Sequence, residues 1–171
     1  DIIEKEKITM FNGVPTMTHE ILQASKLYPE KDISSLKDLG AGGAARPPEQ
    51  LEQHQKEFPD KNALIGYGLT ETNAGGTNAG GQFLLNKPST AGFPMPLITE
   101  IRIVNEQNRV LDHDEEGEIE IKSASNFICY WKNQEATDEV LSKDGWFKSG
   151  DIGYLDDEGF LFIKDRKKDI V

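Results

Sequence analysis

Apolar and polar positions follow two different patterns along the chain, which divide it near its middle. In the first half, short apolar runs alternate with segments of helical spacing, a pattern typical of strand–helix–strand units around a parallel sheet. Strands are predicted at residues 8–14, 36–39 and 63–67. Helices are predicted from Pro15 to Tyr28 and from Pro47 to Phe58, since each begins with a proline that suits a first helical turn.

The two predicted helices differ in their apolar positions. In the first helix these positions have helical spacing, at Met17, Ile21, Ala24 and Tyr28. The second helix offers only Leu51 and Phe58, so we expect it to lie at the surface. Residues 74–89, which are rich in Gly, Asn, Thr and Gln, are predicted to form a functional loop.

In the second half, apolar and polar residues alternate with period two, which is typical of strands. The clearest cases are the Ile-Arg-Ile run at 101–103 and the Ile-Glu-Ile run at 119–121. We also expect a helix from Asn133 to Leu141 and a hairpin of residues 149–155 and 160–164.

These patterns predict an α/β fold class. The end of a βαβ parallel-sheet subdomain is expected over residues 1–90, followed by a small, mostly antiparallel distorted β-barrel over residues 91–165.

The formal net charge of −11 narrows the possible ligands. It argues against binding of nucleic acid, because DNA or RNA phosphates need a basic surface. A phosphate ligand would need backbone N–H groups, Mg²⁺ or a few local cations instead. The single cysteine, Cys129, excludes an internal disulfide and fits a reducing compartment. With no transmembrane segment and no signal peptide in view, we expect a cytoplasmic protein.

Two candidate motifs lie in the first half. The small residues Gly42, Gly43, Ala44 and Ala45 link a strand to a helix, where a ligand can approach the main chain, although a plain turn explains them equally well. The segment 67–72 follows the third strand, at the edge where open α/β sheets bind ligands. Tyr67 offers a ring for stacking, Thr70 a hydroxyl for phosphate and Glu71 a carboxylate for Mg²⁺, and a helix cap is the alternative.

Two further motifs lie in the second half. Asp151 follows a glycine at the start of a strand, where its carboxylate can accept hydrogen bonds from two ribose hydroxyls. A turn aspartate that bonds its own backbone is the alternative. The basic run at 165–169 follows an apolar strand and suits ribose or phosphate oxygens, although charge runs of this kind are usually solvated.

In this order, the motifs resemble those of adenylate-forming enzymes, the superfamily of acyl-CoA synthetases, luciferases and peptide-synthetase adenylation domains. The matching segments cover nearly the whole chain and are Gly13–Met17, Gly40–Ala45, Tyr67–Thr72, Gly117–Trp131, Asn133–Thr137, Asp144–Ile163 and Asp165–Val171. The basic run looks like that of fatty-acid or long-chain acyl-CoA ligases, since peptide-synthetase domains usually carry Gly-Arg-x-Asp there.

The resemblance implies a nucleotide site in the first half of the chain. Tyr67 is expected to stack on adenine, with Gly66 and Gly68 keeping the floor of the pocket close. The segment from Gly42 to Ala45 is expected to line the adenine side and the neighbouring acyl channel. Thr70 is expected to hold the nucleotide phosphate and Glu71 the Mg²⁺, which makes them the expected catalytic residues.

The resemblance also implies roles near the end of the chain. Asp151 is expected to bind the ribose hydroxyls of ATP or AMP, with Arg166 beside them. Lys168 falls where the family has its hinge residue, so residues 166–171 are expected to lead into a missing C-terminal domain.

A parent enzyme of this kind is an AMP-forming carboxylic acid–CoA ligase. A carboxylic acid, expected to be a fatty acid, reacts with ATP to give an acyl-adenylate and pyrophosphate, and coenzyme A then displaces AMP. A fatty-acyl-AMP ligase and a non-catalytic nucleotide-binding module are the alternatives. The family's phosphate loop would lie upstream of Gly13 and its C-terminal lysine beyond Val171, so we expect N- and C-terminal parts to be missing and this chain to be inactive alone.

Overall fold

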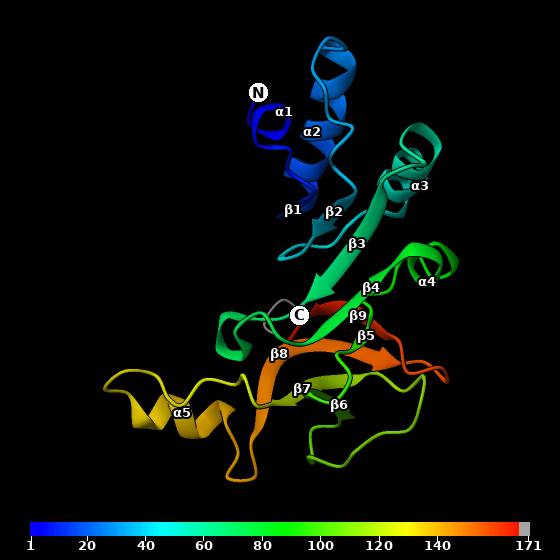
Figure 1. Cartoon of the computed structure of the whole chain (residues 1–171). Helices are drawn as coiled ribbons and strands as arrows, with labels where there is room; N and C mark the ends of the chain where they lie inside the picture. Colours follow the sequence, from blue (N-terminus) through cyan, green and yellow to red (C-terminus); the bar gives the residue numbers. More distant parts are fainter. Residues whose placement is uncertain (168–171) are drawn as a thin grey trace. The chain divides into compact units, whose positions relative to one another are not determined.

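The computed structural model describes residues 1–167 and contains two compact units. The first unit comprises residues 1–66 and 79–89, and the second comprises residues 67–78 and the described residues from 90 onward. The chain leaves the first unit at the end of β3 (Asn62–Tyr67) and returns to it within β4 (Thr77–Gly80) (Figure 1).

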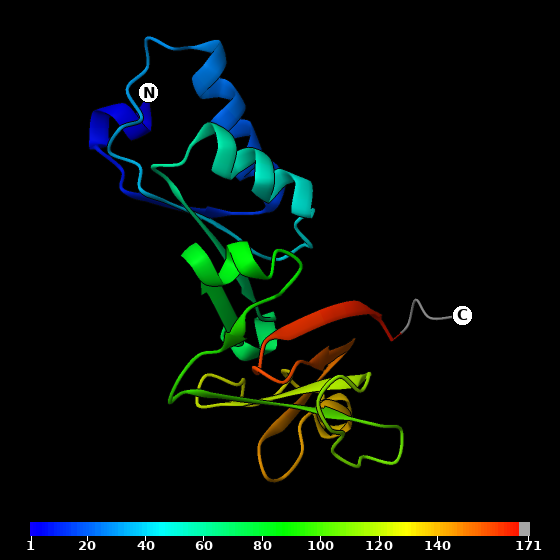
Figure 2. The same cartoon turned by 90° about the vertical axis from the view of Figure 1, so that its right-hand side faces the viewer.

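The first unit is built on adjacent parallel strands. β1 (Met10–Gly13) pairs with β2 (Asp38–Ala41), and β2 pairs with β3, so that Phe11, Leu39 and Ala63 stand side by side. Parallel neighbours need a crossover connection, and here helices supply it. The helices of the unit are α1 (Ile2–Glu6), α2 (Pro15–Leu27), α3 (Pro48–Glu57) and α4 (Gly81–Asn86). Figure 2 shows α2 and α3 running alongside each other over the sheet.

Two apolar clusters hold these helices on the sheet. Leu22 of α2 packs with Leu36 and Leu39, and Leu51 of α3 packs with Ala63, Ala79 and Leu84. Each cluster joins at least one helix to at least one strand, which is the burial that stabilises a layered α/β fold.

Polar residues occupy buried positions that apolar spacing does not predict. The buried face of α2 is formed by Pro15, Thr18 and Leu22, whereas Met17 is 47% exposed and Tyr28 is 57% exposed. Thr18 tolerates burial because its hydroxyl donates to the carbonyl of Pro15 at 2.9 Å. The predicted functional loop at 74–89 instead contains β4 and α4.

The second unit is mostly an antiparallel sheet. Its strands are β6 (Thr99–Val104), β7 (Gly117–Ser123), β8 (Trp146–Leu155) and β9 (Leu161–Arg166), in that order, with short β5 (Phe93–Pro94) outside it and α5 (Gln134–Val140) between β7 and β8. Asn133 caps α5, as predicted, by accepting from the Ala136 N–H at 3.1 Å.

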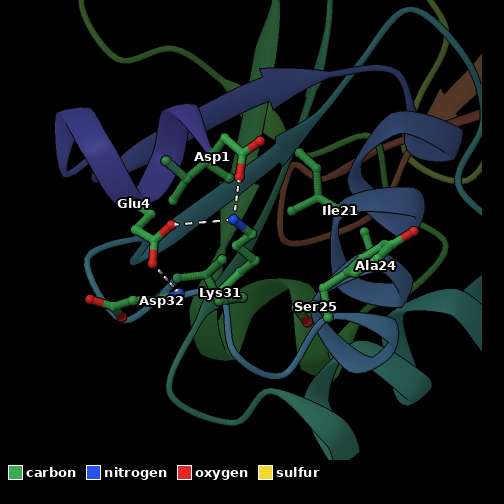
Figure 3. Close-up of a pocket in the computed structure, with 10 residues that line it drawn as sticks. Asp1, Glu4, Ile21, Ala24, Ser25, Lys31 and Asp32 are labelled. Carbon is green, nitrogen blue, oxygen red and sulfur yellow. Dashed lines mark hydrogen bonds and ion pairs between the residues drawn. The ribbon is translucent and has the colours of Figure 1, made fainter.

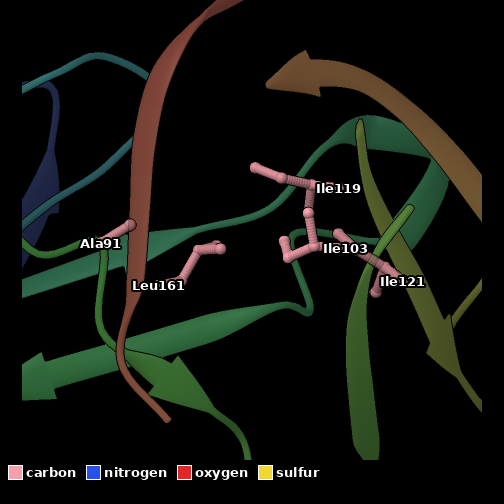
Figure 4. Close-up of a cluster of buried hydrophobic side chains, with 5 residues drawn as sticks. All are labelled: Ala91, Ile103, Ile119, Ile121 and Leu161. Atoms are coloured by element: carbon pink, nitrogen blue, oxygen red, sulfur yellow. The ribbon is translucent and has the colours of Figure 1, made fainter. Parts of the chain in front are cut away.

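The core of this unit comes from the inward residues of these strands. Ile103, Ile119, Ile121, Leu161 and Ala91 form one buried cluster, shown in Figure 4. Glu120, between two of these isoleucines, is only 2% exposed. Its carboxylate accepts a 2.7 Å hydrogen bond from Nε of Arg102 on the neighbouring strand, so the buried charge is paired.

The predicted fold class is confirmed: parallel α/β structure precedes an antiparallel β unit. The four strands of the second unit form an open sheet, and no closed barrel is found among residues 1–167. In the same range no helix combines the length and apolarity needed to cross a membrane. The subdomain boundaries expected near residues 90 and 165 stay a prediction.

Candidate functional site

The turn after β3 is built by close main-chain packing. Residues 70–72 form the 3₁₀ turn η1 (Thr70–Thr72), in which the Thr72 hydroxyl accepts from the Leu69 N–H at 3.0 Å. A Cβ on Gly68 would lie 2.5 Å from the carbonyl of Ala74, and one on Gly76 would lie 2.3 Å from the carbonyl oxygen of Tyr67. Only glycine fits at these two positions, so part of the motif's sequence is explained by packing.

Glu71 projects from this turn toward the segment that follows β7. Its Oε1 accepts a hydrogen bond from the Tyr130 hydroxyl at 2.7 Å. Its backbone carbonyl accepts from the Phe127 N–H at 2.6 Å. Partial burial and the neighbouring Glu71 carboxylate raise the pKa of Tyr130 to about 12, so at neutral pH the tyrosine keeps its proton and donates a hydrogen bond to the carboxylate.

Asp151 lies on the inner face of β8. The register of β8 and β9 places Asp151 directly opposite Arg166, and Nε of Arg166 is 3.3 Å from Oδ1 of Asp151. The other oxygen, Oδ2, accepts a hydrogen bond from the Tyr67 hydroxyl at 2.7 Å. Asp151 is only 5% exposed, so its two partners compensate for the water that this carboxylate loses on burial.

The Tyr67 hydroxyl is held protonated by the same arrangement. Burial is the main cause that raises the pKa of Tyr67 above its ordinary value, and the hydrogen bond to the Asp151 carboxylate acts in the same direction. Tyr67 is therefore a fixed donor to Asp151, which sets the orientation of its ring.

A cleft of about 740 Å³ opens in the second unit beside these residues. Four residues predicted from the sequence line it: Gly68, Thr70, Glu71 and Arg166. Tyr67 and Asp151 do not line the cleft, although Gly150 and Arg166, which neighbour Asp151 in sequence and across the strands, do. The structure thus brings four of the predicted residues to one cavity and joins two more, Tyr67 and Asp151, to each other.

Other cleft residues were not predicted as site residues. They include Tyr130, Lys148 and Ser149, whereas Lys167 belongs to the basic run at 165–169 that was expected near ribose or phosphate oxygens. Lys167 is paired with Glu118 at 2.8 Å, and both line the cleft. Lys148 adds a further cation. The cleft is lined by as many carboxylates as cations, so it offers a phosphate a few local cations but no net positive charge.

The small-residue motif and Gly66 lie in the first unit. A Cβ on Gly42 would lie 3.2 Å from the carbonyl oxygen of Gly66, so these two segments approach closely at the ends of neighbouring strands. Gly43 has φ +72°, a conformation that favours glycine. The binding roles expected for Gly42, Gly43, Ala44, Ala45 and Gly66 stay predictions, and Lys168, the expected hinge, lies outside the described residues.

A smaller cavity of about 290 Å³ in the first unit contains none of the motif residues. As Figure 3 shows, Lys31 at its mouth points toward Asp1 and Glu4. The Lys31 Nζ lies 2.6 Å from the Asp1 carboxylate and 4.0 Å from that of Glu4. Its cation is therefore already paired. The cleft of the second unit is the candidate site because four of the predicted residues line it.

The donor set of the cleft fits a magnesium ion. Mg²⁺ prefers hard oxygen ligands and usually keeps several waters and substrate phosphates. Glu71 supplies a carboxylate whose Oε2 accepts no hydrogen bond within residues 1–167, and the exposed Thr70 adds a hydroxyl at the same wall. Such a magnesium site takes only one or two ligands from the protein, and one carboxylate beside an open cleft matches this requirement.

Comparison with known proteins gives a consistent result. The family model described as "AMP-binding enzyme" matches residues 1–131. The long-chain-fatty-acid–CoA ligase of Bacillus subtilis is 40% identical over 171 residues, which cover 99% of this chain and 30% of that protein. The 2-succinylbenzoate–CoA ligase of Bacillus velezensis is 35% identical over 172 residues, which cover 100% of this chain and 33% of that protein.

A solved structure agrees with the sequence relatives. O-succinylbenzoate coenzyme A synthetase from Bacillus subtilis, in complex with ATP and magnesium ion, matches with a TM-score of 0.88 and 29% identity. The match covers 99% of this chain and 34% of that one, so the chain spans about a third of the length of its relatives. The family match extends over most of the sequence, and the chain therefore belongs to the AMP-binding enzyme family.

Proposed function

We propose that the chain is part of an AMP-forming ligase that joins a carboxylic acid to coenzyme A. The observation that carries the proposal is the convergence of Thr70, Glu71 and Arg166 on one cleft, beside the bonded pair Tyr67 and Asp151. The relatives are CoA ligases for long-chain fatty acids, succinylbenzoate and feruloyl groups, which supports the same reaction class.

The proposed chemistry has two steps. In the first, a carboxylate oxygen attacks the α-phosphorus of ATP, pyrophosphate leaves, and an acyl-adenylate forms. In the second, the thiol of coenzyme A attacks the acyl carbon, AMP leaves with one of the original carboxylate oxygens, and the thiol proton passes to solvent. Catalysis of such displacements rests mainly on positioning and charge neutralisation.

The residues of this chain bind and orient in this scheme. Tyr67 presents its ring to adenine while its hydroxyl holds Asp151. Asp151 accepts hydrogen bonds from the ribose, and Arg166 balances its charge. Thr70 donates its hydroxyl to a phosphate oxygen. Glu71 holds Mg²⁺, which neutralises charge on the phosphates when it is bound.

The proposed substrate is a fatty acid. The relative that acts on long-chain fatty acids is 40% identical, compared with 35% for the succinylbenzoate ligase. The segment Gly42 to Ala45 is the part of this chain proposed to line the acyl channel, and its small side chains leave room for an alkyl chain.

A substrate panel on the full-length parent tests the proposal. Pyrophosphate release is measured with ATP, Mg²⁺ and a set of fatty, aromatic and amino acids, with and without coenzyme A. We expect fastest release with a fatty acid and a thioester product only when coenzyme A is present. Release with amino acids alone, or none with any acid despite ATP binding, would overturn the proposal.

A further inference from the structure

The segment between β7 and α5 is fastened to the turn that carries Glu71. Residues 125–130 reach this turn through three hydrogen bonds: Ser125 Oγ donates to the Thr72 carbonyl at 2.9 Å, the Phe127 N–H to the Glu71 carbonyl at 2.6 Å, and the Tyr130 hydroxyl to Glu71 Oε1 at 2.7 Å. Two of these bonds fix the main chain of the turn, and only the third touches a side chain that lines the cleft.

Tyr130 is itself held in place at its ring and at its backbone. The ring packs on Phe127 with centroids 4.8 Å apart, and Phe127 meets Phe147 of β8 edge to face at 5.7 Å. Its backbone N–H donates to the hydroxyl of Thr137, a buried residue of α5, at 2.9 Å. A side chain fixed at both ring and backbone delivers its hydroxyl to one point.

That point is one of the two oxygens of Glu71. A free glutamate side chain has three rotatable bonds and loses rotamer entropy when it binds a ligand. With Oε1 held by Tyr130, the carboxylate is oriented before any ligand arrives, while Oε2 of this cleft-lining residue accepts no hydrogen bond within the described residues. Supporting residues of this kind orient metal ligands and change metal affinity when they are removed.

We propose that Tyr130 is a positioning residue for the magnesium site: it fixes Glu71 through Oε1 and leaves Oε2 for the ion. The inference rests on the proposed function, because it takes Glu71 as the magnesium ligand. It adds a residue from a distant part of the chain, 59 positions from Glu71, to the nucleotide site.

Tyr130→Phe in the full-length parent is the test, since it removes one hydroxyl and keeps the ring on Phe127. Tyr154→Phe is the matched control. Tyr154 of β8 stacks on Phe162 of β9, its hydroxyl makes no hydrogen bond within the described residues, and it does not line the cleft. Binding of ATP is measured by isothermal titration in the presence and absence of Mg²⁺.

We expect Tyr130→Phe to weaken binding of Mg·ATP by about three- to tenfold, because the lost hydrogen bond reaches a charged group but is partly exposed to water. Binding of metal-free ATP should be unchanged, and the control should match wild type in both titrations. A structural role alone would weaken both forms of ATP equally.

A double-mutant cycle with Glu71→Gln separates the remaining explanations. If Tyr130 acts through Glu71, Tyr130→Phe has no further effect on Mg·ATP binding when Glu71 is already Gln. An unchanged Mg·ATP affinity in Tyr130→Phe, or full additivity of the two changes, would overturn the inference. If wild-type parent binds ATP with no dependence on Mg²⁺, the proposed function of Glu71 fails instead, and the two failures are therefore distinguishable.

Discussion

Replacing Asp151 with Asn tests whether this carboxylate binds a nucleotide or only holds Tyr67. In the folded chain, Oδ2 accepts from Tyr67 and Oδ1 faces Nε of Arg166. A carboxylate offers about four lone-pair sites, so two remain for the hydroxyls of a ribose. Asn keeps the shape of the side chain, but it has one acceptor oxygen and no charge.

The expected magnitude follows from these contacts. Hydrogen bonds to a charged group each contribute about 1.5–3 kcal/mol, and Asn loses one such bond to the ribose and weakens the other. We expect a loss of about 2–4 kcal/mol in ATP binding, or about 30- to 1,000-fold. The free energy of unfolding should fall by only about 1 kcal/mol, because the Asn oxygen can still accept from Tyr67. The lost ion pair with Arg166 is weak, because the Arg166 side chain is 69% exposed.

Isothermal titration of Mg·ATP into the full-length parent measures this effect. Asp157→Asn, an identical change at an exposed position of the β8–β9 turn, is the control. Tyr67→Phe removes the hydroxyl that Asp151 holds and shows how much of the effect passes through the tyrosine. ATP binding by Asp151→Asn equal to wild type, or a Tyr67→Phe defect as large as that of Asp151→Asn, would refute direct ribose binding.

Three further changes test other parts of the structure. Gly76→Ala places a Cβ 2.3 Å from the Tyr67 carbonyl oxygen, so we expect it to lower the free energy of unfolding by about 2 kcal/mol or more in chemical denaturation, whereas Asn78→Ala at an exposed position should cost less than about 0.5 kcal/mol. His54 is 1% exposed and bonded through Nδ1 to Arg46, and burial lowers its pKa. The free energy of unfolding should therefore not depend on this group above pH of about 6.5, and should fall as the pH decreases from there toward the folded pKa. The same pH series with His54→Gln should lack this fall. Lys168→Pro in the parent should leave adenylate formation nearly intact and slow thioester formation from isolated adenylate by at least about tenfold, and equal slowing of both half-reactions would reject the hinge.

The periodic elements could be predicted from the sequence, because their burial is set by residues close together in the chain. The hairpin of β8 and β9 is an example, since its two apolar segments and the Gly-containing turn between them are local signals. In α2 and α3, apolar spacing does not predict the buried face completely. Thr18 and His54 are buried there because each is hydrogen-bonded. The Gly and Asn content of residues 74–89 predicts a loop, although the segment contains a four-residue strand and a short helix.

Candidate site residues could be named from the sequence, but the contacts between them could not. Tyr67 and Asp151 are 84 positions apart, and no local pattern indicates that the hydroxyl of one would meet the carboxylate of the other. The sequence places Tyr130 in a segment that matches the family but does not predict its hydrogen bond to Glu71. Such contacts depend on how β7, β8 and the turn after β3 come together in three dimensions, which a single sequence does not encode in its spacing.

Transfer of an oxygen label tests the central claim most directly. The full-length parent is incubated with ATP, Mg²⁺, coenzyme A and a fatty acid that carries ¹⁸O in its carboxylate. The masses of the nucleotide products are then measured by mass spectrometry. Activation through an acyl-adenylate leaves one labelled oxygen in the phosphate of AMP for each thioester formed. AMP without label, or label in orthophosphate together with ADP, would contradict the AMP-forming ligase proposed from this cleft.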